Sequence, residues 1–304
     1  MFRHLLVPLD GSGLAEAVLP PAAALVERLG ASLTLLHVME RDAPTTIHGE
    51  RHLTEERDAE HYLAEVERRL ALGDRPVARH VHEAKEGDVA LAIVWHAKEL
   101  RADLVVLSTH GRGGLRGLVV GSIAQQVLQR GETPILLIHP AGGMPPPFMC
   151  RTILVPLDGT AAHEPALDAG LALARAFRAR LHLVIVVPTP DTLSGGTAAI
   201  GTMMPLATGA LLDLATQGAA EYVRHRVERL RADGLEASAE VRRGEIAANL
   251  LEATERAGAD VIVMASHGHA GLAAFWQGSV TAKVLARFGR PVLLVHAAGA
   301  GPSA

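Results

Sequence analysis

The sequence predicts an α/β fold in which two doubly wound, five-stranded parallel sheets follow one another in tandem. Three observations lead to this prediction. The chain has 304 residues, a length that suits two domains of ordinary size. A long internal repeat divides it into two copies. Within each copy, short apolar runs alternate with longer segments of helical periodicity, as in sheets whose parallel strands are joined by right-handed helical crossovers.

The internal repeat sets the expected domain boundaries. The run LLVPLDG at 5–11 recurs as ILVPLDG at 153–159, and DLVVLSTHG at 103–111 recurs as DVIVMASHG at 260–268. A repeat this long indicates duplicated domains and not a solenoid. The tract between the copies is rich in proline and glycine, which interrupt helices and central strands. We therefore expect domains at residues 1–140 and 150–298, a linker at 141–149 and a tail at 299–304.

The elements of the first copy follow from its residue pattern. Runs of Val, Leu and Ile bounded by polar residues or glycine predict strands buried on both faces, at 3–9, 32–38, 77–82, 104–108 and 135–138. Helical periodicity predicts helices at about 13–29, 54–70, 88–100 and 119–130. Pro20 and Pro21 predict a kink in the first helix or a late start. Segments 39–53 and 188–208 are long enough to be lids or disordered loops.

Composition and missing motifs exclude several function classes. The net charge is −4 and aromatic residues make up 3%, which argues against nucleic acid as a partner. No apolar run reaches the ~18 residues of a membrane span and the N-terminus has no signal-peptide pattern, so we expect a cytoplasmic protein without a membrane partner. The single cysteine, Cys150, excludes an internal disulfide. A P-loop motif is absent, and no Ser–His–Asp or paired-carboxylate set can be placed.

A pattern of glycine and serine follows the fourth predicted strand of each copy. It reads Ser108-Thr109-His110-Gly111, nine residues, then Gly121-Ser122, and again Ala265-Ser266-His267-Gly268, nine residues, then Gly278-Ser279. Glycines at these places leave backbone amides accessible, and a serine at a helix start adds a hydroxyl beside the unpaired amides of the first turn. Such a helix N-terminus suits a phosphate. The alternative is an ordinary strand-exit turn with a serine cap, which duplication would also preserve.

With these motifs the chain resembles the universal stress protein family in both halves, over roughly 1–140 and 150–297. Nucleotide-binding members of that family carry Gly-x2-Gly-x9-Gly-(Ser/Thr) after the fourth strand. Here Ser108 and Ala265 replace the first glycine, and both are small. The resemblance implies a stress-response protein that binds ATP, with or without Mg²⁺, at the carboxyl ends of the strands, where doubly wound sheets bind their ligands.

The resemblance also implies individual site residues for the adenosine end. Asp10 and Asp158 match a family aspartate near adenine or ribose, although Asp-Gly is also a strong turn signal. Val38 and Val186 match a position whose backbone contacts adenine, and their side chains could be plain core. Further residues would line the adenine pocket or serve in the core alone: Pro8, Leu9, Leu107, Pro156, Leu157 and Met264.

At the phosphate end the resemblance implies that His110 and His267 make backbone or orienting contacts. Arg112 could pair with phosphates or simply be solvated. After the last glycine the family often carries Ser-x-Thr, which the second copy keeps as Ser279-Val280-Thr281, whereas the first has Ser122-Ile123-Ala124. No catalytic residue is assigned, and we expect slow ATP hydrolysis at most.

Two further readings remain open. Loss of the first glycine favours an adaptor of the same fold that contacts an unknown client protein without binding a nucleotide. A metal-dependent activity is a third hypothesis, because His80 and His82 are two residues apart on a predicted strand and face the same side. We interpret these as surface histidines and assign no metal ligand.

The resemblance finally implies an assembly. Family members pair through their fifth strands, so 134–139 and 291–296 would pair within one chain and form a pseudo-dimer. Such a pairing would also cover edge strands that otherwise invite aggregation. Two such chains would then associate as a homodimer.

Overall fold

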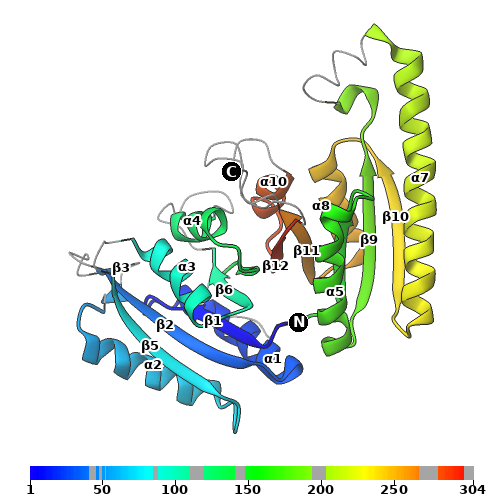
Figure 1. The fold of residues 1–304 in the computed structure, drawn as a ribbon. Helices are drawn as coiled ribbons and strands as arrows, with labels where there is room; N and C mark the ends of the chain where they lie inside the picture. Colours follow the sequence, from blue (N-terminus) through cyan, green and yellow to red (C-terminus); the bar gives the residue numbers. More distant parts are fainter. Residues whose placement is uncertain are drawn as a thin grey trace.

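The computed structural model describes residues 1–40, 46–47, 50–51, 53–84, 88–109, 120–140, 148–193, 203–266 and 280–297. Within these residues, ten strands form one continuous sheet in the order β10-β9-β8-β11-β12-β7-β6-β1-β2-β5 (Figure 1). Each half contributes five of them, which are parallel to one another. The predicted tandem of doubly wound sheets is therefore confirmed.

The first half supplies the strands at one end of the sheet. Its sheet strands are β1 (His4–Pro8), β2 (Ser32–Glu40), β5 (Val77–Ala84), β6 (Leu104–Ser108) and β7 (Ile135–Ile138). Its helices are the 3₁₀ turn η1 (Ala15–Val18), α1 (Leu19–Leu29), α2 (Glu56–Leu70), α3 (Val89–Glu99) and α4 (Ser122–Arg130). Two short strands, β3 (Thr46–Ile47) and β4 (Glu50–Arg51), pair separately.

The second half repeats the arrangement. Its strands are β8 (Thr152–Leu157), β9 (Arg180–Val187), β10 (Ala237–Arg243), β11 (Val261–Ser266) and β12 (Val292–His296). Its helices are η2 (Ala161–His163), α5 (Glu164–Phe177), η3 (Pro190–Thr192), α7 (Pro205–Ala232), α8 (Ile246–Ala257) and α10 (Val280–Leu285). None of the helices described in either half is long and apolar enough to cross a membrane.

Two apolar layers hold helices against the two faces of the sheet. One layer joins the sheet to α1, α2, α5 and α7, with Leu25, Leu63, Leu173 and Val223 from these helices. The other joins it to α3, α4, α8 and α10, with Ile93, Val127, Leu250 and Val284. Central strands such as β6 and β7 are buried along their whole length, which explains their unbroken apolar sequence.

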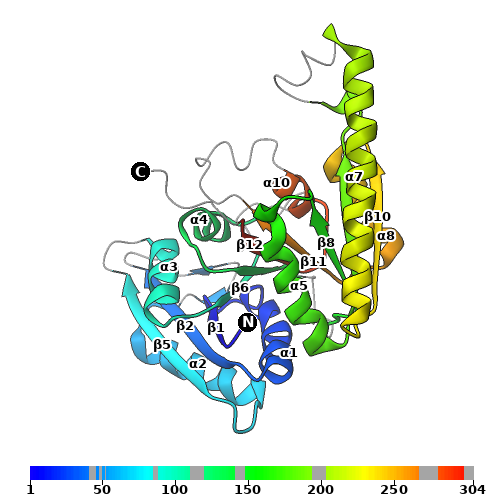
Figure 2. The ribbon, with the colours of Figure 1, turned by 45° about the vertical axis from the view of Figure 1, so that its right-hand side comes forward.

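The halves are joined at the middle of the sheet. β7 and β12 pair antiparallel, with Leu136 opposite Leu293. This is the predicted pairing of fifth strands within one chain, and it leaves β5 and β10 as the outer strands. On one face, α1 of the first half also contacts α5 of the second (Figure 2).

The positions of proline explain one success and one error of the sequence prediction. Pro20 lies in the first turn of α1, where a missing N–H removes no helical hydrogen bond, so the helix starts late as expected. The segment 188–208 was expected to be a loop to its end, but Pro205 begins the 28-residue helix α7. Pro205 marks the helix start, but the high glycine and proline content of the segment led to the prediction of a loop. Likewise, the 39–53 segment includes the end of β2 at Glu40 and the β3–β4 pair.

Candidate functional site

The predicted adenosine residues of the first half lie at the carboxyl edge of the sheet. Pro8 ends β1, Val38 lies near the end of β2 and Leu107 near the end of β6. The backbone N–H of Leu9 continues the ladder by donating to the carbonyl of Leu36 at 2.8 Å. The side chains divide between the two faces, because Leu9 packs in the α1–α2 layer while Val38 and Leu107 pack in the α3–α4 layer. Their backbones, and not one shared apolar wall, therefore meet at this edge.

Both predicted aspartates close the turn that follows the first strand of their half. Ser12 donates to Asp10 Oδ1 from its backbone N–H at 2.9 Å and from its hydroxyl at 2.6 Å. Thr160 makes the same two contacts with Asp158 Oδ1, at 2.9 and 2.8 Å. The following glycines, Gly11 and Gly159, have φ of +89° and +83°, which a side chain would strain. The turn-forming interpretation is thus realised in both halves.

The second aspartate has an additional partner. His163 Nδ1 lies 2.8 Å from Asp158 Oδ2. Burial acts to raise the pKa of Asp158, but the hydrogen bonds from Thr160 and the neighbouring His163 outweigh it and hold this pKa below its ordinary value. The carboxylate is therefore charged at neutral pH.

The start of α4 provides the clearest polar feature of this edge. Gly121 is the N-cap, in an extended conformation, and none of the described side chains caps the helix. Its N–H donates to the carbonyl of Thr109 at 3.2 Å, which ties the helix start to the end of β6. Ser122 is the first helical residue and is exposed, while Ile123 is half-buried. The first-turn amides, which have no intrahelical acceptors, thus lie beside the strand end.

Part of the predicted phosphate end lies outside the described residues: His110, Gly111, Arg112, His267, Gly268, Gly278 and Ser279. The predicted residues of the second half that the structure describes range from buried to exposed. Ala265 and Met264 in β11 are in the core, and Thr281 in α10 is buried rather than exposed. Leu157 is also buried, while Pro156, Val186 and Val280 are half-buried.

The sequence analysis missed a polar pair at the ends of β6 and β7. Thr109 Oγ1 lies 2.6 Å from His139 Nδ1. Burial lowers the pKa of His139 to about 4, so its ring is neutral at physiological pH. Its Nε2 is buried and has no hydrogen-bond partner among the described residues. The available signal was the position of both residues in the repeat. Thr109 and His139 each follow a predicted strand, and the matching residues of the second half, Ser266 and His296, end β11 and β12 and are paired in register.

The opposite edge of the sheet has a cavity of about 750 Å³ at the amino ends of β8, β9 and β10. Its arginines already have partners. Arg256 pairs with Glu240 at 2.6 Å, Arg180 approaches Glu236 at 3.7 Å, and Arg231 Nε donates to the carbonyl of Ala237 at 2.9 Å. These cations are therefore engaged within the protein.

Comparison with known proteins identifies the family. Residues 1–139 and 149–296 each match the sequence profile of the universal stress protein family. The chain belongs to this family, as a member with two tandem domains. Universal stress protein YxiE of Bacillus subtilis is 26% identical over 153 residues, which are 46% of this chain and all of that protein. A universal stress protein of Thermus aquaticus is 32% identical over 139 residues, again 46% of this chain and all of that one.

A solved structure shares the fold over nearly the whole chain. The universal stress protein from Archaeoglobus fulgidus DSM 4304 covers 98% of this chain, which in turn covers 97% of it, with a TM-score of 0.69 at 17% identity. The tandem α/β architecture of this universal stress protein is thus shared with an experimentally determined structure.

Proposed function

We propose that this universal stress protein binds ATP, with or without Mg²⁺, at the carboxyl edge of each half, and that binding more than turnover transmits a stress signal. The observation that supports this most is the start of α4, which has no capping side chain within the part of the chain that the structure describes and which Gly121 ties to the end of β6. A helix N-terminus of this kind stabilises an anion by ~0.3–1 kcal/mol per charge–dipole contact. Phosphates at α4 would place the adenosine toward Asp10 and Val38.

The residues present at this edge fit a nucleotide. Backbone groups near Val38 and Leu9 would contact the base, while Ser122 and the first-turn amides of α4 would hold phosphate oxygens. The buried Nε2 of His139, which lacks a partner among the described residues, is a further polar atom at the end of β7. Since the Asp10 carboxylate already closes its turn, a ribose contact would be added to the bond from Ser12 and would not replace it.

The second half would bind through Ser279, Val280 and Thr281, with Asp158 toward the ribose. Thr281 is buried in the first turn of α10, so in this half the proposed phosphate contacts would come from Ser279 and the backbone. The adaptor function remains the alternative, and its support in the second half is the burial of Thr281 and the contact of His163 with Asp158. The proposal keeps ATP binding for both halves, because the contacts of Thr160 with Asp158 have a counterpart in those of Ser12 with Asp10.

Thermal unfolding with and without millimolar Mg-ATP tests the proposal. A ligand at about 100 times its Kd stabilises the folded state by ~2.7 kcal/mol, so Tm should rise. Gly121→Glu should remove the contribution of the first half by placing a carboxylate where phosphate would bind, and Gly278→Glu that of the second. Gly218→Glu is the matched control, because this glycine lies in α7 with open space around it.

The outcomes separate the two functions. Loss of the shift in one variant assigns the binding half, and partial loss in each shows two sites. An unchanged Tm in the wild-type chain, with purified protein free of adenine nucleotide, would reject ATP binding and leave the adaptor function.

We also propose that two chains associate in the cytoplasm as a homodimer, whose nucleotide state a client protein reads. Support comes from α7, whose N-terminal part extends past the sheet (Figure 1) and exposes Leu206, Leu211 and Leu214. Light scattering should give twice the chain mass for the wild type and a single chain mass for Leu211→Glu. A monomeric wild type would reject this assembly.

A further inference from the structure

Three histidines meet between the outer strand β5 and helix α3, away from any role assigned so far. His80 and His82 are two residues apart on β5 and therefore share one face of the sheet. His96 comes from α3 and lies against both, with its ring centroid 4.5 Å from each of theirs. One ring nitrogen from each histidine lies within 4.8 Å of the other two. We call these residues the histidine cluster.

Two nitrogens of the histidine cluster lack partners. His80 Nε2 and His96 Nε2 are buried, and neither has a hydrogen-bond partner among the described residues. Buried polar atoms are nearly always paired, because leaving one unpaired costs about 1–3 kcal/mol. Three imidazoles with nitrogen atoms this close together, two of which lack a partner among the described residues, are therefore a set that a bound cation would satisfy.

Glu99 prepares His96 for this role. Glu99 Oε2 lies 3.1 Å from His96 Nδ1, and an ionised carboxylate can only accept, so Nδ1 carries the proton. The lone pair of His96 is then on Nε2, the buried nitrogen without a partner. This is the outer-shell arrangement in which a carboxylate orients a metal-bound histidine.

We propose that His80, His82 and His96 form a site for one divalent transition metal ion, with Zn²⁺ as the first candidate. Imidazole nitrogen suits zinc, copper and nickel, whereas magnesium and calcium prefer oxygen. Nitrogens bound to tetrahedral zinc at ~2.0–2.1 Å are about 3.3 Å apart, so small ring rotations would close the cluster. His82 is half-buried, which leaves a side from which a metal can enter and a fourth ligand can bind.

The nearby Trp95 offers a reporter. Its ring centroid lies 5.0 Å from that of His96 and 6.3 Å from that of His82, and 54% of the residue is exposed. A paramagnetic ion such as Cu²⁺ bound by these histidines would quench the fluorescence of Trp95. The sequence analysis named His80 and His82 but missed His96, the buried third ligand.

Calorimetric titration of the metal-stripped, untagged chain with Zn²⁺ alone tests the site, and the Co²⁺ visible spectrum reports its geometry. We expect one ion per chain with a tetrahedral Co²⁺ spectrum. His82→Gln should weaken binding by more than the ~10–100-fold that loss of an outer-shell partner causes, and Glu99→Gln by about that amount. The control is His225→Gln, since His225 is an exposed histidine of α7.

The variants also guard against misfolding. His82 is half-buried, so His82→Gln is expected to keep the wild-type circular dichroism and Tm without metal, and it decides the result if His96→Gln unfolds. Loss of Zn²⁺ binding in His82→Gln with retention in His225→Gln supports the site. Absence of binding by the wild type, or equal binding by His82→Gln, would overturn it.

Discussion

The outer strands of the two halves occupy matching places in the sheet but face their helices with different chemistry. In the first half, His80 and His82 of β5 stand beside Leu36 and Val38 of β2. In the second half, Glu240 and Arg242 of β10 stand beside Val184 and Val186 of β9. Since residues 33–38 recur as 181–186, the two histidines of β5 correspond to Glu240 and Arg242.

The covering helices differ in the same way. His96 is the eighth residue of α3, and the eighth residue of α8 is Ala253. Glu99, which orients His96, corresponds to Arg256, which pairs with Glu240 at 2.6 Å. In each half, the helix thus carries a side chain that contacts the polar side chains of the outer strand: His96 lies against His80 and His82, and Arg256 pairs with Glu240.

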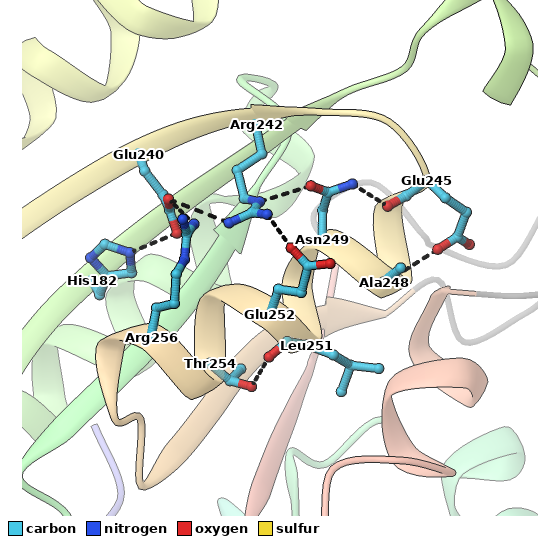
Figure 3. Close-up of polar contacts among 10 residues, drawn as sticks. All are labelled: His182, Glu240, Arg242, Glu245, Ala248, Asn249, Leu251, Glu252, Thr254 and Arg256. Atoms are coloured by element: carbon cyan, nitrogen blue, oxygen red, sulfur yellow. Dashed lines mark hydrogen bonds and ion pairs between the residues drawn. The ribbon is translucent and has the colours of Figure 1, made fainter.

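In the second half, an ion-pair cluster lies between the outer strand β10 and helix α8 (Figure 3). Its members are Glu240, Arg242, Asn249, Glu252 and Arg256. Arg242 bonds to Glu252 and donates through Nε to Asn249 Oδ1 at 2.8 Å. His182 Nε2 also lies 3.3 Å from Glu240 Oε1. Groups of opposite charge pair with one another in this cluster, although Arg242 Nη1 is buried without a hydrogen-bond partner among the described residues and lies 3.8 Å from Glu240 Oε2. In the histidine cluster, the buried Nε2 atoms of His80 and His96 have no partner of opposite charge there. The comparison teaches that duplicated halves can keep one backbone arrangement while the outer strand and its covering helix carry different polar groups.

The largest expected effect concerns the histidine cluster. Zn²⁺ at about 100 times its Kd should raise the free energy of unfolding by ~2.7 kcal/mol in the wild type and by nearly nothing in His82→Gln. Urea denaturation with and without Zn²⁺ measures both values. Equal stabilisation of the wild type and His82→Gln would show that the metal binds elsewhere. The proposed difference between the β5–α3 and β10–α8 interfaces would then be wrong.

A smaller effect is expected from the ion-pair cluster. Arg242→Met should destabilise the chain by about 2 kcal/mol, between the values for buried and exposed pairs, because it leaves Glu240 and Glu252 without their common partner. Arg243→Met is the matched control on the same strand, since its ion pair with Asp213 is exposed, and it should cost below ~1 kcal/mol. Urea denaturation that gave equal losses for the two arginines would show that the cluster is not cooperative.

The smallest effect concerns the aspartate turn of the second half. Asp158→Asn should cost about 1 kcal/mol at pH 7, because a neutral amide accepts the Thr160 hydrogen bonds less well and no longer attracts His163. The pKa of Asp158 is lower in the folded state, so its stabilisation is present above the unfolded value and disappears as pH falls through the folded one. In unfolding curves taken at successively lower pH, the difference between wild type and variant should therefore be largest at pH 7 and should disappear once Asp158 is protonated in the folded state. A pH-independent difference would contradict this assignment.

The sequence predicted those parts of the fold that depend on burial along the chain. Central strands such as β6, β7 and β11 are apolar because both faces are covered, so their residues alone reveal them, whereas the outer strands β5 and β10 carry polar and charged residues. The β7–β12 pairing was expected from the family resemblance and not from the residues themselves. The prediction of a loop as far as residue 208 was wrong, because proline is common both in loops and in the first turn of a helix, and Pro205 begins α7.

The candidate sites could be predicted only in part. Asp10 and Val38 were assigned to the adenosine end by the family resemblance, and the structure places Asp10 after β1 and Val38 near the end of β2. Contacts such as Thr109 with His139, or His96 with His80 and His82, depend on which side chains two separate elements present to each other. His96 lies among the alanines, isoleucine and valine of α3, where helical periodicity marks it as a core position and not as a ligand.

Hydrogen exchange with and without saturating Mg-ATP tests most directly the claim that nucleotide binds at the carboxyl edge. The amides of Val38, Ser122 and Ile123 should exchange more slowly when Mg-ATP is present, while α2 at the opposite side should be unchanged. Protection confined to the cavity that Thr152, Arg180 and Arg231 line, or no protection at all, would contradict the account.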